Sequence, residues 1–202
     1  MTRARFRLNL LGPPGLEAAG TPVHLATRKA LALLAVVTAQ RQGTDRGSLA
    51  ALLWPEKGEE GARASLRQEL SRLSQALGNA LQKPQQSLKL DPEMAQIDLW
   101  EFWEALECGE DARALELHRG PFLQGLQLRD TAEFESWQDT LQQEIQAQYL
   151  AALSRQAERE AAAGNRAGAL ALHRQAVATD PLAEGHYLVA MELCERLGDQ
   201  TG

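Results

Sequence analysis

The pattern of hydrophobic and polar positions at the start of the chain predicts a small sheet followed by two helices. Residues 6–11 and 23–25 alternate apolar with polar side chains around the turn sequence at 12–15, so we expect a short antiparallel sheet. Residues 27–40 are apolar on most sides and begin with a threonine suited to cap a helix, which predicts a largely buried helix. A second, short helix is expected over 45–54, because a proline follows it.

The next apolar stripe predicts a third helix over residues 61–77 with a polar outward face. Four leucines form the stripe at helical spacing: Leu66, Leu70, Leu73 and Leu77. The face away from them carries arginine, glutamine and serine and a single acid, Glu69. After Gly78, apolar residues alternate with polar ones within residues 81–90, around a polar tip at 83–86. This pattern predicts a hairpin with a basic arm.

Strands, three helices and a hairpin follow one another in the order of a winged helix, and three stretches carry a closer resemblance. They are FRLNLLGPPGLEAAGTPVHLATRKALALLA from Phe6, LAALLWPE at 49–56 and ARASLRQELSRLSQALG at 62–78. These stretches resemble the OmpR/PhoB-type winged helix, and more closely its version in SARP-type bacterial transcriptional activators. The resemblance implies that the third helix enters the major groove of double-stranded DNA, with the hairpin as a wing on the adjacent backbone.

The side chains that hydrogen-bond base edges and phosphates are arginine, lysine, glutamine and serine, and they gather on the third helix, the hairpin and the start of the first helix. The expected DNA-binding residues are Arg28, Lys29, Arg63, Ser65, Arg67, Gln68, Ser71, Arg72, Gln75, Lys83, Gln85 and Lys89. Arg28 and Lys29 begin a helix, where cations are unfavourable, so they serve either a phosphate or the structure itself. The resemblance also places Glu69 where related regulators often have a DNA-facing residue.

The resemblance further implies that the loop between the second and third helices, residues 55–60, contacts RNA polymerase. Its candidate contact residues are Glu56, Lys57, Glu59 and Glu60. A regulator that binds DNA through its third helix and polymerase through this loop would be a transcriptional activator.

The charge of the chain changes sign between its two halves. Residues 1–90 hold 13 Lys and Arg against 6 Asp and Glu, a net charge of +7, whereas residues 91–202 hold 8 against 21, a net charge of −13. A basic half suits a polyanion such as DNA, and an acidic half suits contact with protein. We therefore predict two domains, a winged helix over 1–92 that binds DNA by itself and a helical domain over 93–202.

Repetition in the acidic half predicts an all-α, tetratricopeptide-like domain and a mainly α protein. GEDARALELHR at 109–119 and GNRAGALALHR at 164–174 agree at seven of eleven positions. Gly164 and Gly198 are 34 residues apart, which is the tetratricopeptide period. A long helix is expected from residue 132 to about residue 163.

Two stretches of this half, RGPFLQGL at 119–126 and FESWQDTLQQEIQAQYLAAL at 134–153, resemble the bacterial transcriptional activator domain that follows the winged helix in SARP-type proteins. The resemblance therefore covers residues 5–199. It implies a helical module used for dimerisation, for regulation or for contact with the transcription machinery, and DNA sites arranged as direct repeats.

The last helix has the apolar residues Tyr187, Met191 and Cys194 and no following helix of its repeat. The sequence is therefore either a piece of a longer protein or a chain that packs its last helix against a partner. An apolar face without an internal partner favours an interaction site, so we expect these three residues to form the interface of a homodimer, at least on DNA.

Motifs for catalysis, cofactors and metals are absent from the sequence. There is no phosphate-binding GxxxxGK[ST], no dinucleotide-binding GxGxxG and no HExxH, and no apolar run approaches the ~18 residues of a membrane span. The four histidines form no close-spaced pair, and His118 and His173 are expected on helix surfaces. With two cysteines in all, Cys108 and Cys194, the sequence predicts a cytoplasmic, nucleoid-associated protein with reduced thiols, no metal, no cofactor and no enzymatic activity.

The function predicted from the sequence is a sequence-specific DNA-binding transcriptional regulator. Two other functions stay open. One is a helical-repeat adaptor whose winged helix contacts protein, and the other is a nucleoid-associated protein that binds DNA without sequence preference. The salt dependence and the specificity of DNA binding separate these alternatives.

Overall fold

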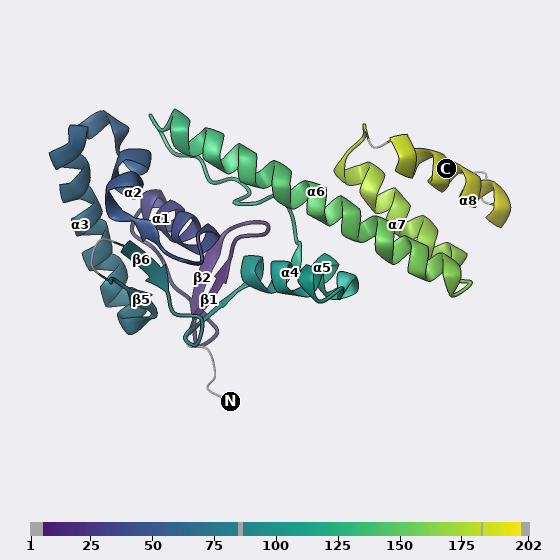
Figure 1. The fold of residues 1–202 in the computed structure, drawn as a ribbon, viewed down its shortest axis with the longest axis horizontal. Coiled ribbons are helices and arrows are strands. Elements are labelled where there is room, and N and C mark those ends of the chain that lie inside the picture. Colours follow the sequence, from purple (N-terminus) through teal and green to yellow (C-terminus); the bar gives the residue numbers. More distant parts are fainter. Residues whose placement is uncertain (1–5, 85–86, 183, 199–202) are drawn as a thin grey trace. The chain divides into compact units, whose positions relative to one another are not determined.

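A computed structural model describes residues 6–84, 87–182 and 184–198 of the chain (Figure 1). The described residues form two compact units, each built from two segments of the chain. The first unit comprises the residues up to Glu101 together with Leu117–Gln142, and the second comprises Phe102–Glu116 and the residues from Gln143 onward.

This division does not follow the predicted boundary between residues 92 and 93. The reason is that residues 95–101 and 117–142 belong with the N-terminal elements. The first unit therefore contains the winged helix and two further segments that the sequence assigned to the helical half.

The N-terminal sheet has four strands in the order β3-β2-β1-β7. The strands are β1 (Phe6–Asn9), β2 (Gly15–Ala18), β3 (Thr21–Pro22) and β7 (Ala95–Ile97). β2 pairs antiparallel with β1 and with β3, as the alternation predicted. β7 pairs parallel with β1 and places Ala95 opposite Phe6 and Ile97 opposite Leu8. The fourth strand thus comes from beyond the predicted winged-helix domain.

Three helices and a second sheet complete the winged helix. The helices are α1 (Arg28–Ala39), α2 (Arg46–Leu53) and α3 (Gly58–Leu77), with the 3-10 turns η1 (Pro55–Lys57) and η2 (Gly78–Ala80). The second sheet has the order β4-β6-β5 and consists of β4 (Thr44–Asp45), β5 (Leu81–Gln82) and β6 (Ser87–Leu90). The predicted capping of α1 is confirmed, because the Thr27 hydroxyl accepts a hydrogen bond from the backbone N–H of Ala30 at 3.0 Å.

Leucines of α1, α2 and β6, together with two that follow β1, form the centre of the winged-helix core. Those with no solvent exposure are Leu10, Leu11, Leu33, Leu34, Leu49, Leu53 and Leu88. Burial of a leucine side chain stabilises a fold by about 1.5–3 kcal/mol, and α3 packs against α1 and α2 through its own buried leucines, Leu66, Leu70, Leu73 and Leu77. The outer face of α3 therefore projects from a rigid support.

A buried carboxylate joins the segment after β7 to the N-terminal sheet. The side chain of Asp98 accepts hydrogen bonds from the backbone N–H groups of Leu10 and Leu11, at 2.8 Å and 3.0 Å, and forms an ion pair with Arg119 at 2.8 Å. Burial raises the pKa of Asp98, although these partners act in the opposite direction. Close by, the backbone N–H of Leu123 donates to the carbonyl of Leu10 at 2.8 Å. The winged helix therefore depends on contacts from residues just before and just after Phe102–Glu116, which is the first segment of the second unit.

The second unit is helical. Its elements are the end of α4 (Asp98–Glu107), α5 (Asp111–Leu117), most of α6 (Ala132–Ala162), α7 (Arg166–Thr179) and α8 (Glu184–Leu197). The predicted long helix corresponds to α6, whose residues Ile145, Tyr149, Leu153 and Ala157 are buried. The two repeated sequences give α5 and α7. Each follows a glycine in the left-handed backbone region, with φ of +72° at Gly109 and +82° at Gly164, which explains why both copies begin with glycine.

The expected placement of the histidines on helix surfaces is wrong. His118 and His173 are both half-buried, and burial lowers the pKa of each. The fold also brings together two histidines that are 13 positions apart, since Nδ1 of His173 lies 3.0 Å from Nδ1 of His186. Nε2 of His186 lies 3.2 Å from the Ser154 hydroxyl. The pairing depends on α7 packing against α8, which sequence spacing alone did not show.

Candidate nucleic-acid interface

Helix α3 presents its predicted polar face to solvent. The apolar stripe Leu66, Leu70, Leu73 and Leu77 is buried against the rest of the winged helix. The predicted contact residues on the other side are exposed, namely Arg63, Arg67, Gln68, Ser71, Arg72 and Gln75. They follow one another at helical spacing over about three turns, so they share one side of α3.

Glu69 is not on this face, and its expected position among DNA-facing residues is wrong. Its side chain is buried, with an exposed fraction of 5% for the residue. The position lies three residues after Leu66 and four before Leu73, so it falls at the edge of the apolar stripe. The Glu69 carboxylate accepts a hydrogen bond from the Thr27 hydroxyl at 2.9 Å and pairs with Arg72 at 3.3 Å.

These contacts give Glu69 a positioning role at the start of α1. The Thr27 hydroxyl caps α1 as acceptor and donates to Glu69, so one side chain joins α1 to α3. The same carboxylate holds the guanidinium of Arg72, whose side chain remains 46% exposed. The single acid of α3 therefore places an arginine at the edge of the polar face.

The other predicted cations make contacts within the first unit. Arg63 pairs with Glu59 at 2.6 Å, one turn earlier on α3. Lys29 pairs with Glu56 at 3.4 Å and lies over the Trp54 ring, 5.3 Å from its centroid. The exposed Arg28 donates to the backbone carbonyl of Gln127 at 3.3 Å. Ser65, which is half-buried, accepts a hydrogen bond from Lys57 at 2.9 Å.

The wing carries fewer free cations than the sequence predicted. β5 and β6 form the hairpin, and Lys89 is half-buried opposite Gln82. The ammonium of Lys83 donates to the hydroxyl of Ser74 and to the carbonyl of Leu70 at 3.4 Å, so it lies against α3 instead of extending from the tip. Gln85 lies outside the described residues.

The segment predicted as a polymerase-contact loop is mostly helical. Glu56 and Lys57 belong to η1, and α3 already begins at Gly58. Glu59 and Glu60 therefore occupy the first turn of α3, where acids are favoured by the helix dipole, and both are exposed. The prediction of a loop over 55–60 is therefore wrong for its last three residues, because α3 begins three residues earlier than the predicted start at Gly61.

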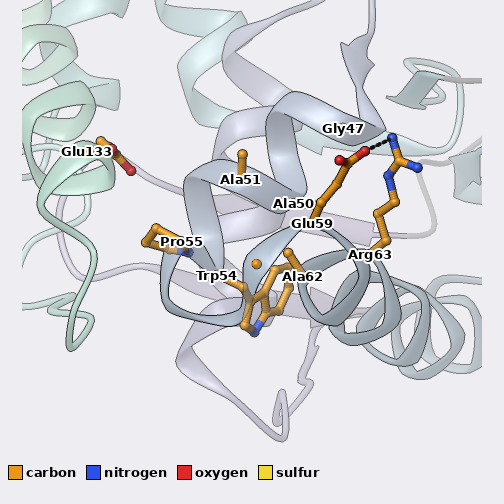
Figure 2. Close-up of a pocket in the computed structure, with 10 residues that line it drawn as sticks. Gly47, Ala50, Ala51, Trp54, Pro55, Glu59, Ala62, Arg63 and Glu133 are labelled. Atoms are coloured by element: carbon orange, nitrogen blue, oxygen red, sulfur yellow. Dashed lines mark ion pairs between the residues drawn. The ribbon is translucent and has the colours of Figure 1, made fainter.

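A cavity of about 460 Å³ opens beside this segment (Figure 2). Small residues of α2 and α3 line it together with Trp54, Pro55 and Glu133, and the Glu59–Arg63 ion pair lies at its rim. Its walls consist mainly of Gly47, Ala50, Ala51, Gly58 and Ala62. The surface next to the predicted contact residues is thus hollow and largely apolar.

Sequence reasoning missed one cation, Arg46. It is the first residue of α2, and it lines a groove of about 960 Å³ together with Arg63 and Arg67. Nothing in the hydrophobic pattern marks Arg46, since it falls between the N-cap Asp45 and a glycine. Only the packing of α2 on α3 brings it to the other two arginines.

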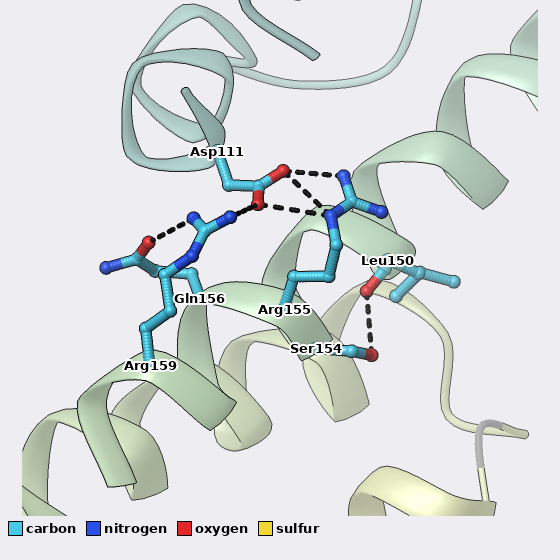
Figure 3. Close-up of polar contacts among 6 residues, drawn as sticks. All are labelled: Asp111, Leu150, Ser154, Arg155, Gln156 and Arg159. Atoms are coloured by element: carbon cyan, nitrogen blue, oxygen red, sulfur yellow. Dashed lines mark hydrogen bonds and ion pairs between the residues drawn. The ribbon is translucent and has the colours of Figure 1, made fainter. Parts of the chain in front are cut away.

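In the second unit, a buried acid fixes the first repeat. Figure 3 shows the Asp111 carboxylate between two arginines of α6, with Nε of Arg155 at 3.1 Å and Nη2 of Arg159 at 2.8 Å. Burial by itself would raise the pKa of Asp111, but the hydrogen bonds and charges of Arg155 and Arg159 hold it below its ordinary value. This contact ties α5 to α6.

The predicted interface residues of α8 divide between two faces. Tyr187 and Met191 are 54% and 53% exposed, and Leu188 between them is also exposed. Cys194 does not belong with them, because it is buried with Leu170 and Ala190 between α7 and α8. The exposed apolar stripe is therefore Tyr187, Leu188 and Met191, which we call the α8 stripe.

Among the described residues, no three histidine, cysteine, aspartate or glutamate side chains lie together in a way that could hold a metal ion. None of the helices in the described ranges is both long and apolar enough to cross a membrane.

Comparison with known proteins gives a likeness to a solved structure. No protein-family model matches the sequence, and no curated protein matches it. Among solved structures, EmbR of Mycobacterium tuberculosis, solved in complex with a low-affinity phosphopeptide, is similar with a TM-score of 0.71 and 26% sequence identity. The similarity covers 98% of this chain and 56% of the EmbR chain, so this chain spans a little over half of that protein's length.

EmbR is a SARP-family regulator, and the likeness supports a SARP-like fold for this chain. The predicted fold class, a winged helix followed by an all-α domain, is confirmed. The class of protein that this fold resembles is a transcriptional regulator.

Proposed function

We propose that the protein is a sequence-specific DNA-binding regulator that activates transcription by recruiting RNA polymerase. The observation that carries this proposal is the exposed polar face of α3 on a winged helix, with Gln68, Ser71 and Gln75 at its centre and Arg67 and Arg72 at its edges. Glutamine and arginine read adenine and guanine by paired hydrogen bonds in the major groove. The net charge of +7 in residues 1–90 supports the same function.

Binding of the full-length chain to duplex DNA tests the proposal. With roughly four to six phosphate contacts, the logarithm of the association constant should fall with the logarithm of salt concentration with a slope of about −4 to −5. The measurement is fluorescence anisotropy on a duplex enriched by selection from random sequence, with a scrambled duplex of equal length as control. Absence of binding to any duplex at low salt would favour the adaptor function instead, and equal affinity for both duplexes would favour a nucleoid-associated binder.

Recruitment of polymerase is proposed for the surface formed by η1 and the first turn of α3. Glu59 and Glu60 are exposed there, Glu56 and Lys57 lie just before them, and the cavity beside Trp54 offers an apolar depression. A surface with exposed charges around an apolar hollow has the composition of a protein-binding site.

We further propose that neighbouring copies on direct-repeat DNA sites contact each other head to tail, with the α8 stripe of one copy against a different surface of the next, because a two-fold contact would match a palindrome. Replacing Tyr187 and Met191 by glutamate should remove this contact, because it places two charges in an apolar interface. We expect the double variant to lose cooperative binding to a two-site duplex, measured by anisotropy, and to sediment as monomer. The matched control replaces the exposed α7 residues Ala171 and Ala178 by glutamate, which adds the same charge away from the stripe. Unchanged cooperativity in the Tyr187→Glu, Met191→Glu variant would exclude this interface.

A further inference from the structure

We propose that Arg46, Arg63 and Arg67 together bind one phosphate group of the DNA backbone at the flank of α3. This inference rests on the proposed DNA-binding function and adds to it a phosphate site centred on a residue that the sequence pattern did not mark. The three arginines line a single groove of about 960 Å³ between α2 and α3.

One hydrogen-bond donor of Arg46 is unsatisfied. Its Nε atom is buried and has no hydrogen-bond partner among the described residues. A buried donor without a partner is unfavourable, and an arginine offers several further donors in a fixed plane. Because Arg46 lines the groove, an anion bound there would accept hydrogen bonds from this guanidinium.

The two acids that line the groove already have local roles in the fold. Asp45 and Glu60 also line it. The Asp45 carboxylate is already engaged as the N-cap of α2, where it accepts from the backbone N–H of Ser48 at 2.8 Å, and this contact lowers its pKa. Glu60 lies in the first turn of α3, where the helix dipole favours an acid. Both carboxylates thus have local roles at helix starts.

Arg63 and Arg67 stand one turn apart on α3. Arg63 pairs with Glu59, but both side chains are mostly exposed, at 61% and 75%. An exposed i,i+4 pair of this kind contributes little to stability because solvent screens it, so a phosphate can replace Glu59 at little cost. Arg67 is exposed and directly precedes Gln68 in the sequence. The groove therefore borders the face that is proposed to read bases.

A phosphodiester suits the chemistry of this groove. Guanidinium groups bind phosphate oxygens through paired, charge-assisted hydrogen bonds, and three of them from two helices can surround one phosphate. A contact of this kind fixes the orientation of the winged helix on the duplex without reading sequence. Arg46 would then hold α2 on the DNA backbone while α3 lies in the major groove of the DNA.

The test compares the full-length Arg46→Gln variant with the wild-type chain on the selected and scrambled duplexes. We expect about a five- to twentyfold loss of affinity on both duplexes alike, and a salt slope that is smaller in magnitude by about 0.9. Arg113→Gln is the matched control, because Arg113 is an exposed arginine of the second unit and its replacement changes the net charge equally. Arg46→Lys should keep the salt slope and recover part of the affinity, which separates loss of a phosphate contact from damage to the fold.

Neutralising single phosphates provides the second readout. Methylphosphonate groups are placed one at a time along the selected duplex. At one position, the wild-type chain should lose affinity whereas Arg46→Gln should lose nothing further. That position identifies the phosphate that this site binds. If the wild-type chain binds DNA and Arg46→Gln keeps its affinity and salt slope, the phosphate site is wrong although the proposed function stands. If the wild-type chain binds no duplex, both fail.

Discussion

A chain that ends at residue 92 is expected to lose the cooperative unfolding transition of the winged helix. Such a chain lacks β7, which pairs with β1, and it lacks Asp98, which accepts from the backbone N–H groups of Leu10 and Leu11. It also lacks Phe122, which pairs with Leu11 in an isolated bridge. Two unpaired buried donors cost about 1–3 kcal/mol each, and loss of a strand exposes further apolar surface, which together rivals the whole stability of a small domain.

Thermal unfolding followed by circular dichroism measures this effect on the fragment 1–92 and on the full-length Asp98→Ala variant. The variant should be destabilised by about 2–5 kcal/mol, since it removes the acceptor of both donors and the partner of Arg119. Glu104→Ala is the control, as an exposed acid of the same helix. If the fragment 1–92 unfolds cooperatively at the same midpoint temperature as the full chain, β7 and Asp98 are dispensable. That result would support the predicted domain boundary between residues 92 and 93.

Loss of base readout is the second large effect. Replacing Gln68 or Arg72 by alanine should each weaken binding to the preferred duplex by about 1–3 kcal/mol, which is roughly five- to 150-fold, and should relax the preference at one base pair. Arg72 is held at the edge of the reading face by the buried Glu69, so the guanidinium is already oriented before DNA arrives. Lys83→Gln, by contrast, should weaken all sequences alike, because Lys83 lies beside α3 at the wing.

The sequence allowed prediction of the features that depend on local periodicity. The three helices of the winged helix, the hairpin, the N-cap Thr27 and the long helix α6 follow from apolar spacing and capping residues. Their outward faces follow as well, since a 3.6-residue period determines which side of α3 is buried.

Features that depend on contacts between distant segments could not be predicted in this way. The parallel strand β7 carries only three residues, and its pairing with β1 spans almost 90 positions. Arg46 lies beside Arg63 and Arg67 only because α2 packs against α3, and the two histidines pair only because α7 packs against α8. The predicted outward position of Glu69 is wrong because its charge favours the exposed face, whereas its place beside the leucine stripe buries it.

Selection of bound sequences from a random duplex library, carried out in parallel with the wild-type chain and with Arg72→Ala, tests the central claim most directly. The wild-type chain is expected to enrich a defined motif, repeated in the same direction on the duplex. Arg72→Ala should enrich a motif that has lost its preference at one position of each repeat and is otherwise unchanged. A library that stays random with the wild-type chain, or motifs that are identical with both proteins, would contradict the account in which α3 reads DNA sequence.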